Sequence, residues 1–97
     1  MRGPGVGENP SLTSKKAQVR LYTRAGCHLC EEAKREILAA GCAERYVLEE
    51  IDIDDDPALR ERYGWEIPVI TINGIKAFKY RLTSAEFRAK LRRLAGD

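Results

Sequence analysis

The spacing of apolar residues changes several times along the chain, and each change predicts a new element of secondary structure. Apolar and polar positions alternate over residues 19–23, which is typical of a strand with one buried face. Over residues 28–40 the apolar positions recur at helical spacing, with acids in the first turn and Gly41 placed as a left-handed cap. Residues 46–53 return to a strand pattern that starts buried and ends with one solvent-facing side.

Two further helices are marked by their caps. Asp56-Pro57 combines an N-cap residue with a proline suited to the first turn, and predicts a short helix that Gly64 can close. Thr83–Glu86 has the sequence of a capping box, and Leu82 and Phe87 are spaced as its hydrophobic staple. We therefore predict a C-terminal helix that packs on the sheet.

A two-residue turn joins the last two predicted strands. Asn73-Gly74 separates the apolar runs 69–72 and 75–80, and both turn residues tolerate positive φ. The pattern predicts a β-hairpin with a type I′ turn, and the complete order of elements becomes β-α-β-α-β-β-α.

Charge is unevenly distributed, although the 97 residues carry a net charge of only +2. Residues 44–56 hold seven acids and one arginine, whereas residues 76–93 hold seven bases and one glutamate. The bases are interspersed with apolar positions, which is typical of a solvated helix face and argues against nucleic-acid binding. No segment has the apolar length of a membrane span or a secretory signal, so we expect no membrane association.

Residues 1–16 differ in composition from the rest of the chain. They hold three of the eight glycines and two of the four prolines, with few bulky apolar residues to offset the entropy of ordering. We predict a flexible tail over residues 1–16 and one domain over residues 17–97. A cytoplasmic location is expected; the basic, acid-poor tail leaves a mitochondrial presequence open, although it has no amphipathic helical period.

The strongest chemical signal is the C-x-x-C sequence formed by Cys27 and Cys30. Cys27 would lie at a helix N-terminus, where unpaired N–H groups and the helix dipole can lower a thiol pKa from about 8.5 to about 3.5–7.5. Cys30 lies one turn along the same face, within disulfide reach and less accessible. We predict that Cys27 attacks a substrate disulfide and that Cys30 resolves the resulting mixed disulfide.

A metal-binding role is the alternative hypothesis for this pair. A closed four-ligand zinc site within one chain is disfavoured, because His28 and Cys42 are the only other soft ligands. Two thiolates nevertheless suffice to carry Cu(I) or Zn(II) between partners. A non-catalytic binding or metal-delivery module that uses the Cys27/Cys30 dithiol as ligand therefore stays open.

Two sequence segments together resemble the glutaredoxin-like branch of the thioredoxin superfamily, over about residues 18–94. The segments are TRAGCHLCEEAKREIL and, after the second predicted helix, YGWEIPVITING. The resemblance implies a thioredoxin-like α/β fold with a mixed four-stranded sheet flanked by helices, and thiol-disulfide oxidoreductase activity. It also implies a cis Pro68 facing the cysteines and an Ile67 backbone that pairs with substrate as an added strand. The residues by themselves would favour an ordinary trans proline that opens a strand.

The chain departs from that family pattern at two places. Dithiol glutaredoxins have C-P-Y-C, whereas His28 and Leu29 separate the cysteines here. The Gly-Gly segment followed by an acid, which resembles a glutathione clamp in that family, is missing after Asn73-Gly74. This argues against glutathione specificity and against an iron–sulfur carrier that bridges two chains through the clamp. The predicted chemistry needs no bound cofactor or metal, and glutathione or a thioredoxin-reductase-like system would supply electrons.

Three residues are candidate substrate contacts beside Ile67 and Pro68. His28 could donate a hydrogen bond to the Cys27 thiolate, or be a solvated residue without a role, and Leu29 shares its place between the thiols. Trp65 could line a substrate groove or fill the core. We expect a monomer that acts on disulfides of proteins or small molecules.

Three further features have ordinary structural interpretations. Cys42 is predicted to be a small buried hydrophobe. The acidic run at residues 52–56 is predicted to be a solvated strand end and helix cap rather than a calcium loop. Exposed hairpin charge is favoured over carboxylate binding for three bases: Lys76, Lys79 and Arg81.

Overall fold

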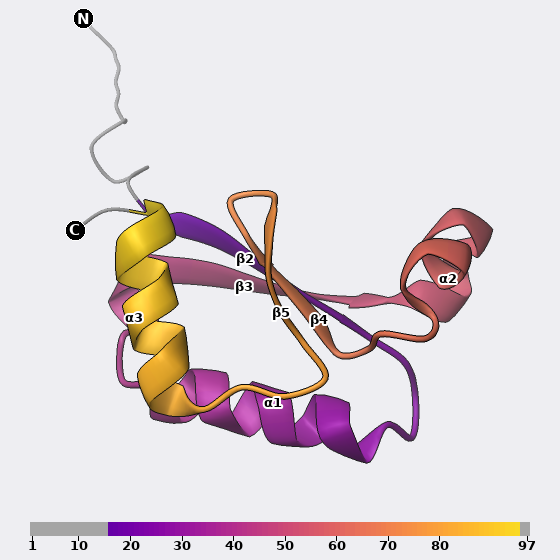
Figure 1. The fold of residues 1–97 in the computed structure, drawn as a ribbon, viewed down its shortest axis with the longest axis horizontal. Coiled ribbons are helices and arrows are strands. Elements are labelled where there is room, and N and C mark those ends of the chain that lie inside the picture. Colours follow the sequence, from indigo (N-terminus) through magenta and orange to yellow (C-terminus); the bar gives the residue numbers. More distant parts are fainter. Residues whose placement is uncertain (1–15, 96–97) are drawn as a thin grey trace, which may run out of the picture.

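The computed structural model describes residues 16–95, and its helices and strands follow the predicted order (Figure 1). The predicted tail, apart from Lys16, lies outside the described residues. The strands are β2 (Ala17–Thr23), β3 (Tyr46–Asp52), β4 (Val69–Ile72) and β5 (Ile75–Lys79). The α-helices are α1 (His28–Ala39), α2 (Pro57–Tyr63) and α3 (Ser84–Ala95), and 3₁₀ turns at Ala43–Arg45 and Ile53–Asp55 flank β3.

The four strands form one mixed sheet in the order β3-β2-β4-β5. β2 runs parallel to β3 and antiparallel to β4, which in turn pairs antiparallel with β5. β2 and β4 are therefore central, and all four residues of β4 are buried. This is the α/β, thioredoxin-like arrangement that the family resemblance implied.

Alternate side chains of the central strands face two separate hydrophobic clusters. Val19 and Leu21 of β2 lie in the larger cluster, which also contains buried residues of α1 and α3. Tyr22 lies in the smaller cluster with Val69 of β4 and Tyr63 of α2. Because neighbouring residues of a strand point to opposite faces, the two clusters place α1 and α3 on one face of the sheet and α2 on the other.

Helix α3 is fixed at its start and along its buried face. The predicted capping box forms: Glu86 Oε1 accepts from the Thr83 N–H at 3.0 Å, and Thr83 Oγ1 accepts from the Glu86 N–H at 3.1 Å. One turn on, Phe87 is fully buried and meets Tyr46 of β3 edge-on, with ring centroids 5.5 Å apart. Phe87 therefore packs α3 against the edge strand β3.

The hairpin forms with the predicted turn. Asn73 has φ 52° and Gly74 has φ 84°, the positive values that a type I′ turn needs. Asn73 also bonds to β2, because its N–H donates to the Gln18 carbonyl and its Oδ1 accepts from the Gln18 N–H, both at 2.8 Å. The turn is thereby held against the neighbouring strand.

Several predicted boundaries were wrong by one residue. The first helix ends at Ala39, and the last strand ends at Lys79 because Tyr80 takes a φ of 72° that no strand residue adopts. Ile53 lies in a 3₁₀ turn, where it is fully buried, rather than in β3. Val47, predicted to be buried, is 49% exposed because β3 is an edge strand.

Candidate active site

The two cysteines of the C-x-x-C sequence lie at the N-terminus of α1. Cys27 is the N-cap residue, and its Sγ accepts a hydrogen bond from the backbone N–H of Cys30 at 3.1 Å. Its carbonyl accepts the first helical bond, from the Glu31 N–H at 3.1 Å. Gly26, with φ 77°, turns the chain out of the preceding loop and into this cap. The predicted position of Cys27 is confirmed.

Cys27 and Cys30 form a disulfide, with their Cα atoms 5.2 Å apart. The two cysteines differ in solvent access. Cys27 is partly exposed, whereas Cys30, a residue of the first turn of α1, is only 2% exposed. Only the Cys27 end of the pair is open to an incoming molecule. This is the asymmetry of access that the sequence predicted.

Strand register brings Pro68 and the loop before Cys27 to the same end of the central strands. Tyr22 near the end of β2 pairs with Val69 at the start of β4. The loop that leads from β2 to Cys27 and the residue that precedes β4 therefore lie at one end of this strand pair. Pro68 is fully buried there, and the Ile67-Pro68 peptide bond is cis, as the family resemblance implied.

Ile67 has unpaired backbone polar groups at this end of the strands. The Pro68 carbonyl is occupied, because it accepts from the Tyr80 N–H at 2.9 Å. Within residues 16–95, neither the N–H nor the carbonyl of Ile67 makes a hydrogen bond, while its side chain packs against the smaller cluster. A backbone with unpaired polar groups at this end of the strands can accept an extended segment as an added strand.

The remaining predicted contacts flank the disulfide and the proline. His28, the first residue of α1, is exposed, and Leu29 is half-buried. Trp65, in the turn between α2 and Ile67, is 91% exposed. The alternative in which Trp65 fills the core is therefore wrong.

An ion pair that sequence reasoning missed holds the loop before Cys27. The Arg24 guanidinium donates twice to Asp54, from Nε at 3.2 Å and from Nη2 at 2.9 Å. The Arg24 hydrogen bond holds the pKa of the Asp54 carboxyl below its usual range. Such a forked contact fixes orientation as well as distance. Arg24 and Asp54 are 30 residues apart, so no local pattern could have paired them.

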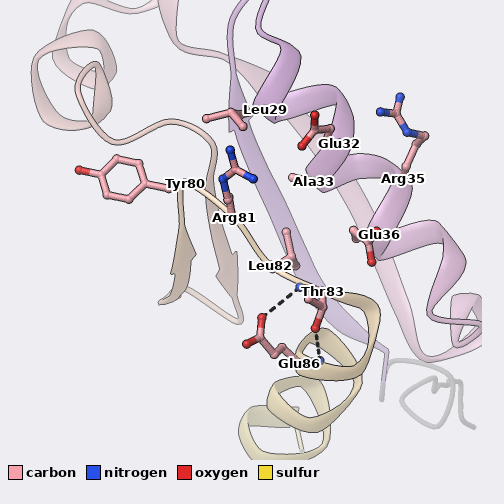
Figure 2. A pocket seen from close by; sticks show the side chains of 10 residues that line it. All are labelled: Leu29, Glu32, Ala33, Arg35, Glu36, Tyr80, Arg81, Leu82, Thr83 and Glu86. Carbon is pink, nitrogen blue, oxygen red and sulfur yellow. Dashed lines mark hydrogen bonds between the residues drawn. The ribbon is translucent and has the colours of Figure 1, made fainter.

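A cavity of about 540 Å³ opens beside Leu29, between α1 and the segment that leads into α3 (Figure 2). Two of its carboxylates are occupied: Glu36 accepts from the Ser84 N–H and hydroxyl at 2.8 and 2.9 Å, and Glu86 belongs to the capping box. The side chain of Arg81 points toward Leu29 in Figure 2. The cavity joins segments far apart in sequence, and of its polar lining the sequence had singled out only Arg81 and the capping-box residues.

The other singled-out residues have structural roles. Cys42 is a free, buried cysteine of the larger cluster, as predicted. Lys76 and Lys79 are exposed and face Glu66, with N–O distances of 2.6 and 3.8 Å, which confirms the interpretation as hairpin charges. In the acidic run, Asp56 caps α2 by accepting from the Ala58 N–H at 2.9 Å.

No three residues among the described histidines, cysteines and acids are grouped so that they could hold a metal ion. Across residues 16–95, we find no helix with the length and apolar character that crossing a membrane requires.

Comparison with known proteins agrees with this geometry. Residues 18–92 match the family model described as Glutaredoxin-like domain (DUF836). The chain belongs to this glutaredoxin-like family. A relative named Glutaredoxin-like protein YDR286C homolog, from Dictyostelium discoideum, is 35% identical over an alignment of 75 residues, and the match covers 70% of this chain and 68% of the relative.

Solved structures resemble the glutaredoxin-like chain over most of its length. The X-ray structure of protein XcR50 from X. campestris has a TM-score of 0.68 at 29% identity, and the match covers 77% of this chain and 96% of that one. A thioredoxin mutant from Halobacterium salinarum has a TM-score of 0.63 at 12% identity, over 87% of this chain and 79% of its own. At that identity the thioredoxin shows the shared fold alone.

Proposed function

We propose that this glutaredoxin-like protein is a thiol-disulfide oxidoreductase. The observation that carries the proposal is the position of Cys27, whose sulfur caps α1, accepts the Cys30 N–H at 3.1 Å and is disulfide-bonded to Cys30. A helix N-terminus stabilises negative charge. In the reduced protein, the same N–H is in place to stabilise a Cys27 thiolate over the thiol.

The cycle follows from the unequal access of the two sulfurs. The Cys27 thiolate attacks one sulfur of a substrate disulfide, an S–S bond forms between them, and the other substrate sulfur leaves as a thiolate that takes up a proton. Cys30 then loses its proton and attacks the Cys27 sulfur. The second substrate thiol departs, and the Cys27–Cys30 disulfide forms. Two electrons have passed from the protein to the substrate, and of the two protons taken up by the product thiols one comes from Cys30 and one from solvent.

The return to the dithiol needs an external thiol reductant. We propose glutathione, or a protein dithiol system such as one resembling thioredoxin reductase, with no bound cofactor or metal in the protein. Each turn of the reverse exchange oxidises two reductant thiols to one disulfide. We propose further that the protein works as a monomer on disulfides of proteins or small molecules, with neither nucleic acid nor membrane as partner.

Substrate contacts in this proposal surround the Cys27 sulfur. The open N–H and carbonyl of Ile67 pair with an extended substrate segment, and the buried Pro68 fixes that backbone next to the redox pair. His28 and Leu29 border the attacking sulfur from α1, and Trp65 borders the far side of the Ile67 backbone. The support for this arrangement is that the register of β2 and β4 brings the two loops to one end of this central strand pair.

A variant without the resolving thiol tests the proposed roles. Cys30→Ser, reduced and then mixed with bis(2-hydroxyethyl) disulfide, should accumulate a mixed disulfide on Cys27, because nothing remains to release it. Intact-mass analysis with peptide mapping measures the adduct. The matched Cys27→Ser variant should form none at Cys30, which is 2% exposed. Equal adducts on both variants, or none on Cys30→Ser, would reject the assignment.

A further inference from the structure

Trp65 is the most exposed large hydrophobic side chain among the described residues. It is 91% exposed, whereas Leu38, Ile75 and Val47 are each about half exposed. Tryptophan is highly buried on average, and its large amphipathic ring gives contact area when a partner covers it. An indole left in water two residues from the proposed substrate backbone at Ile67 is therefore a candidate substrate contact. Tryptophans that become buried in an interface are also frequent among the few residues that dominate protein–protein affinity.

Hydrogen bonds fix the backbone on both sides of Trp65. The Gly64 N–H donates to the Arg60 carbonyl at 2.9 Å, and the Glu66 N–H donates to the Tyr63 carbonyl at 2.8 Å. The Tyr63 ring packs on Tyr22 with a centroid distance of 4.6 Å. Little ordering of this turn is therefore needed when a partner covers the indole.

In the proposed complex, Trp65 lies beside the part of an extended substrate that flanks the cystine. It precedes Ile67 by two residues, and a segment paired with Ile67 advances about 3.3 Å per residue. A residue one or two positions away from the substrate cystine can then cover the indole. A small disulfide without flanking residues makes no such contact, so Trp65 does not strengthen its binding.

Basic side chains surround this turn. The Glu66 carboxylate faces both Lys76 and Lys79, at 2.6 and 3.8 Å. Arg62 lies 5.8 Å from the Tyr63 ring centroid. With Glu61 counted beside Glu66, two acids stand against these three bases. A small net positive charge therefore remains around this turn, which favours acidic groups on whatever binds there.

We infer that Trp65 makes the site selective for disulfides carried in extended protein segments, with an apolar residue near the cystine and acidic residues beside it. This rests on the proposed thiol-disulfide exchange and specifies its substrate class. The segment pairs with the Ile67 backbone, its apolar side chain covers the indole, and its acids face Lys76, Lys79 and Arg62.

Steady-state kinetics on two disulfides test the selectivity. Trp65→Ala should lower the ratio of kcat/KM for insulin to kcat/KM for bis(2-hydroxyethyl) disulfide by about tenfold to a hundredfold, as expected for loss of a dominant contact. Trp65→Phe should restore most of the ratio. Leu38→Ala removes an apolar side chain of α1 that is 55% exposed, and should leave the ratio unchanged.

The outcomes distinguish a failure of the proposed selectivity from a failure of the proposed thiol-disulfide exchange. A wild-type protein that reduces both disulfides, combined with an unchanged ratio in Trp65→Ala, rejects the selectivity and leaves the exchange activity standing. A wild-type protein that reduces neither disulfide rejects the proposed function itself.

Two synthetic cystine peptides test the charge preference. The peptides differ only in having aspartates or lysines beside the same apolar residue. The aspartate peptide should have the higher kcat/KM, and the difference should shrink as salt is raised, since these charges are exposed. A faster lysine peptide, or a difference that salt does not alter, contradicts the preference.

Discussion

Cys27→Ser should reduce disulfide turnover by at least about a thousandfold, because a serine hydroxyl can neither replace the attacking thiolate nor form a disulfide. The side chain is otherwise similar in size, and a serine oxygen can still accept the Cys30 N–H as an N-cap. The variant should therefore fold as the wild type does. Turnover of bis(2-hydroxyethyl) disulfide, with far-ultraviolet circular dichroism as the folding control, measures the effect.

Cys42 supplies the matched control for this loss. It is the chain's third thiol, but it is buried in the larger cluster, away from the N-terminus of α1. Cys42→Ser should keep its turnover per folded molecule, whatever it loses in stability. Substantial activity in Cys27→Ser that disappears on further replacement of Cys42 would show that the redox centre has been misplaced.

Phe87→Ala should lower the free energy of unfolding by about 3–5 kcal/mol, the range for removing a fully buried phenylalanine. Phe87 is 0% exposed and is the contact through which α3 meets Tyr46 at the opposite edge of the sheet. Its removal takes away both the buried apolar surface and the edge-on aromatic pair. For a domain whose total stability is about 5–15 kcal/mol, this is a large fraction.

Chemical denaturation of the oxidised protein measures that loss. The exposed Arg93→Ala on the same helix should change the free energy by no more than about 0.5 kcal/mol. A loss below about 1 kcal/mol for Phe87→Ala, with an unchanged denaturant dependence, would mean that α3 is not anchored through this ring.

Local rules account for the features that the sequence predicted well. The hairpin at Asn73-Gly74 and the capping box at Thr83 each depend on neighbours within a few residues, as does the N-cap at Cys27. The helix N-terminus of the site could therefore be predicted without any tertiary information, and so could the unequal access of Cys27 and Cys30.

Features that depend on neighbours distant in sequence could not be predicted from periodicity. Val47 is exposed only because β3 lies at the sheet edge, which follows from the strand order. The closeness of Pro68 to the Cys27 loop depends on the pairing of Tyr22 with Val69, and it was expected only through the family resemblance. For Trp65, groove and core were equally compatible with the sequence, since exposure depends on where the whole of α2 packs.

The pH dependence of Cys27 alkylation in the fully reduced protein tests the central claim most directly. Iodoacetamide modification rates, assigned to each cysteine by peptide mapping, give the apparent pKa of the attacking thiol. We expect the apparent pKa of Cys27 to lie well below the ordinary thiol value of about 8.5, with fast modification at pH 6. An apparent pKa at or above about 8.5 would contradict it, because the end of α1 would then provide no stabilisation of the thiolate.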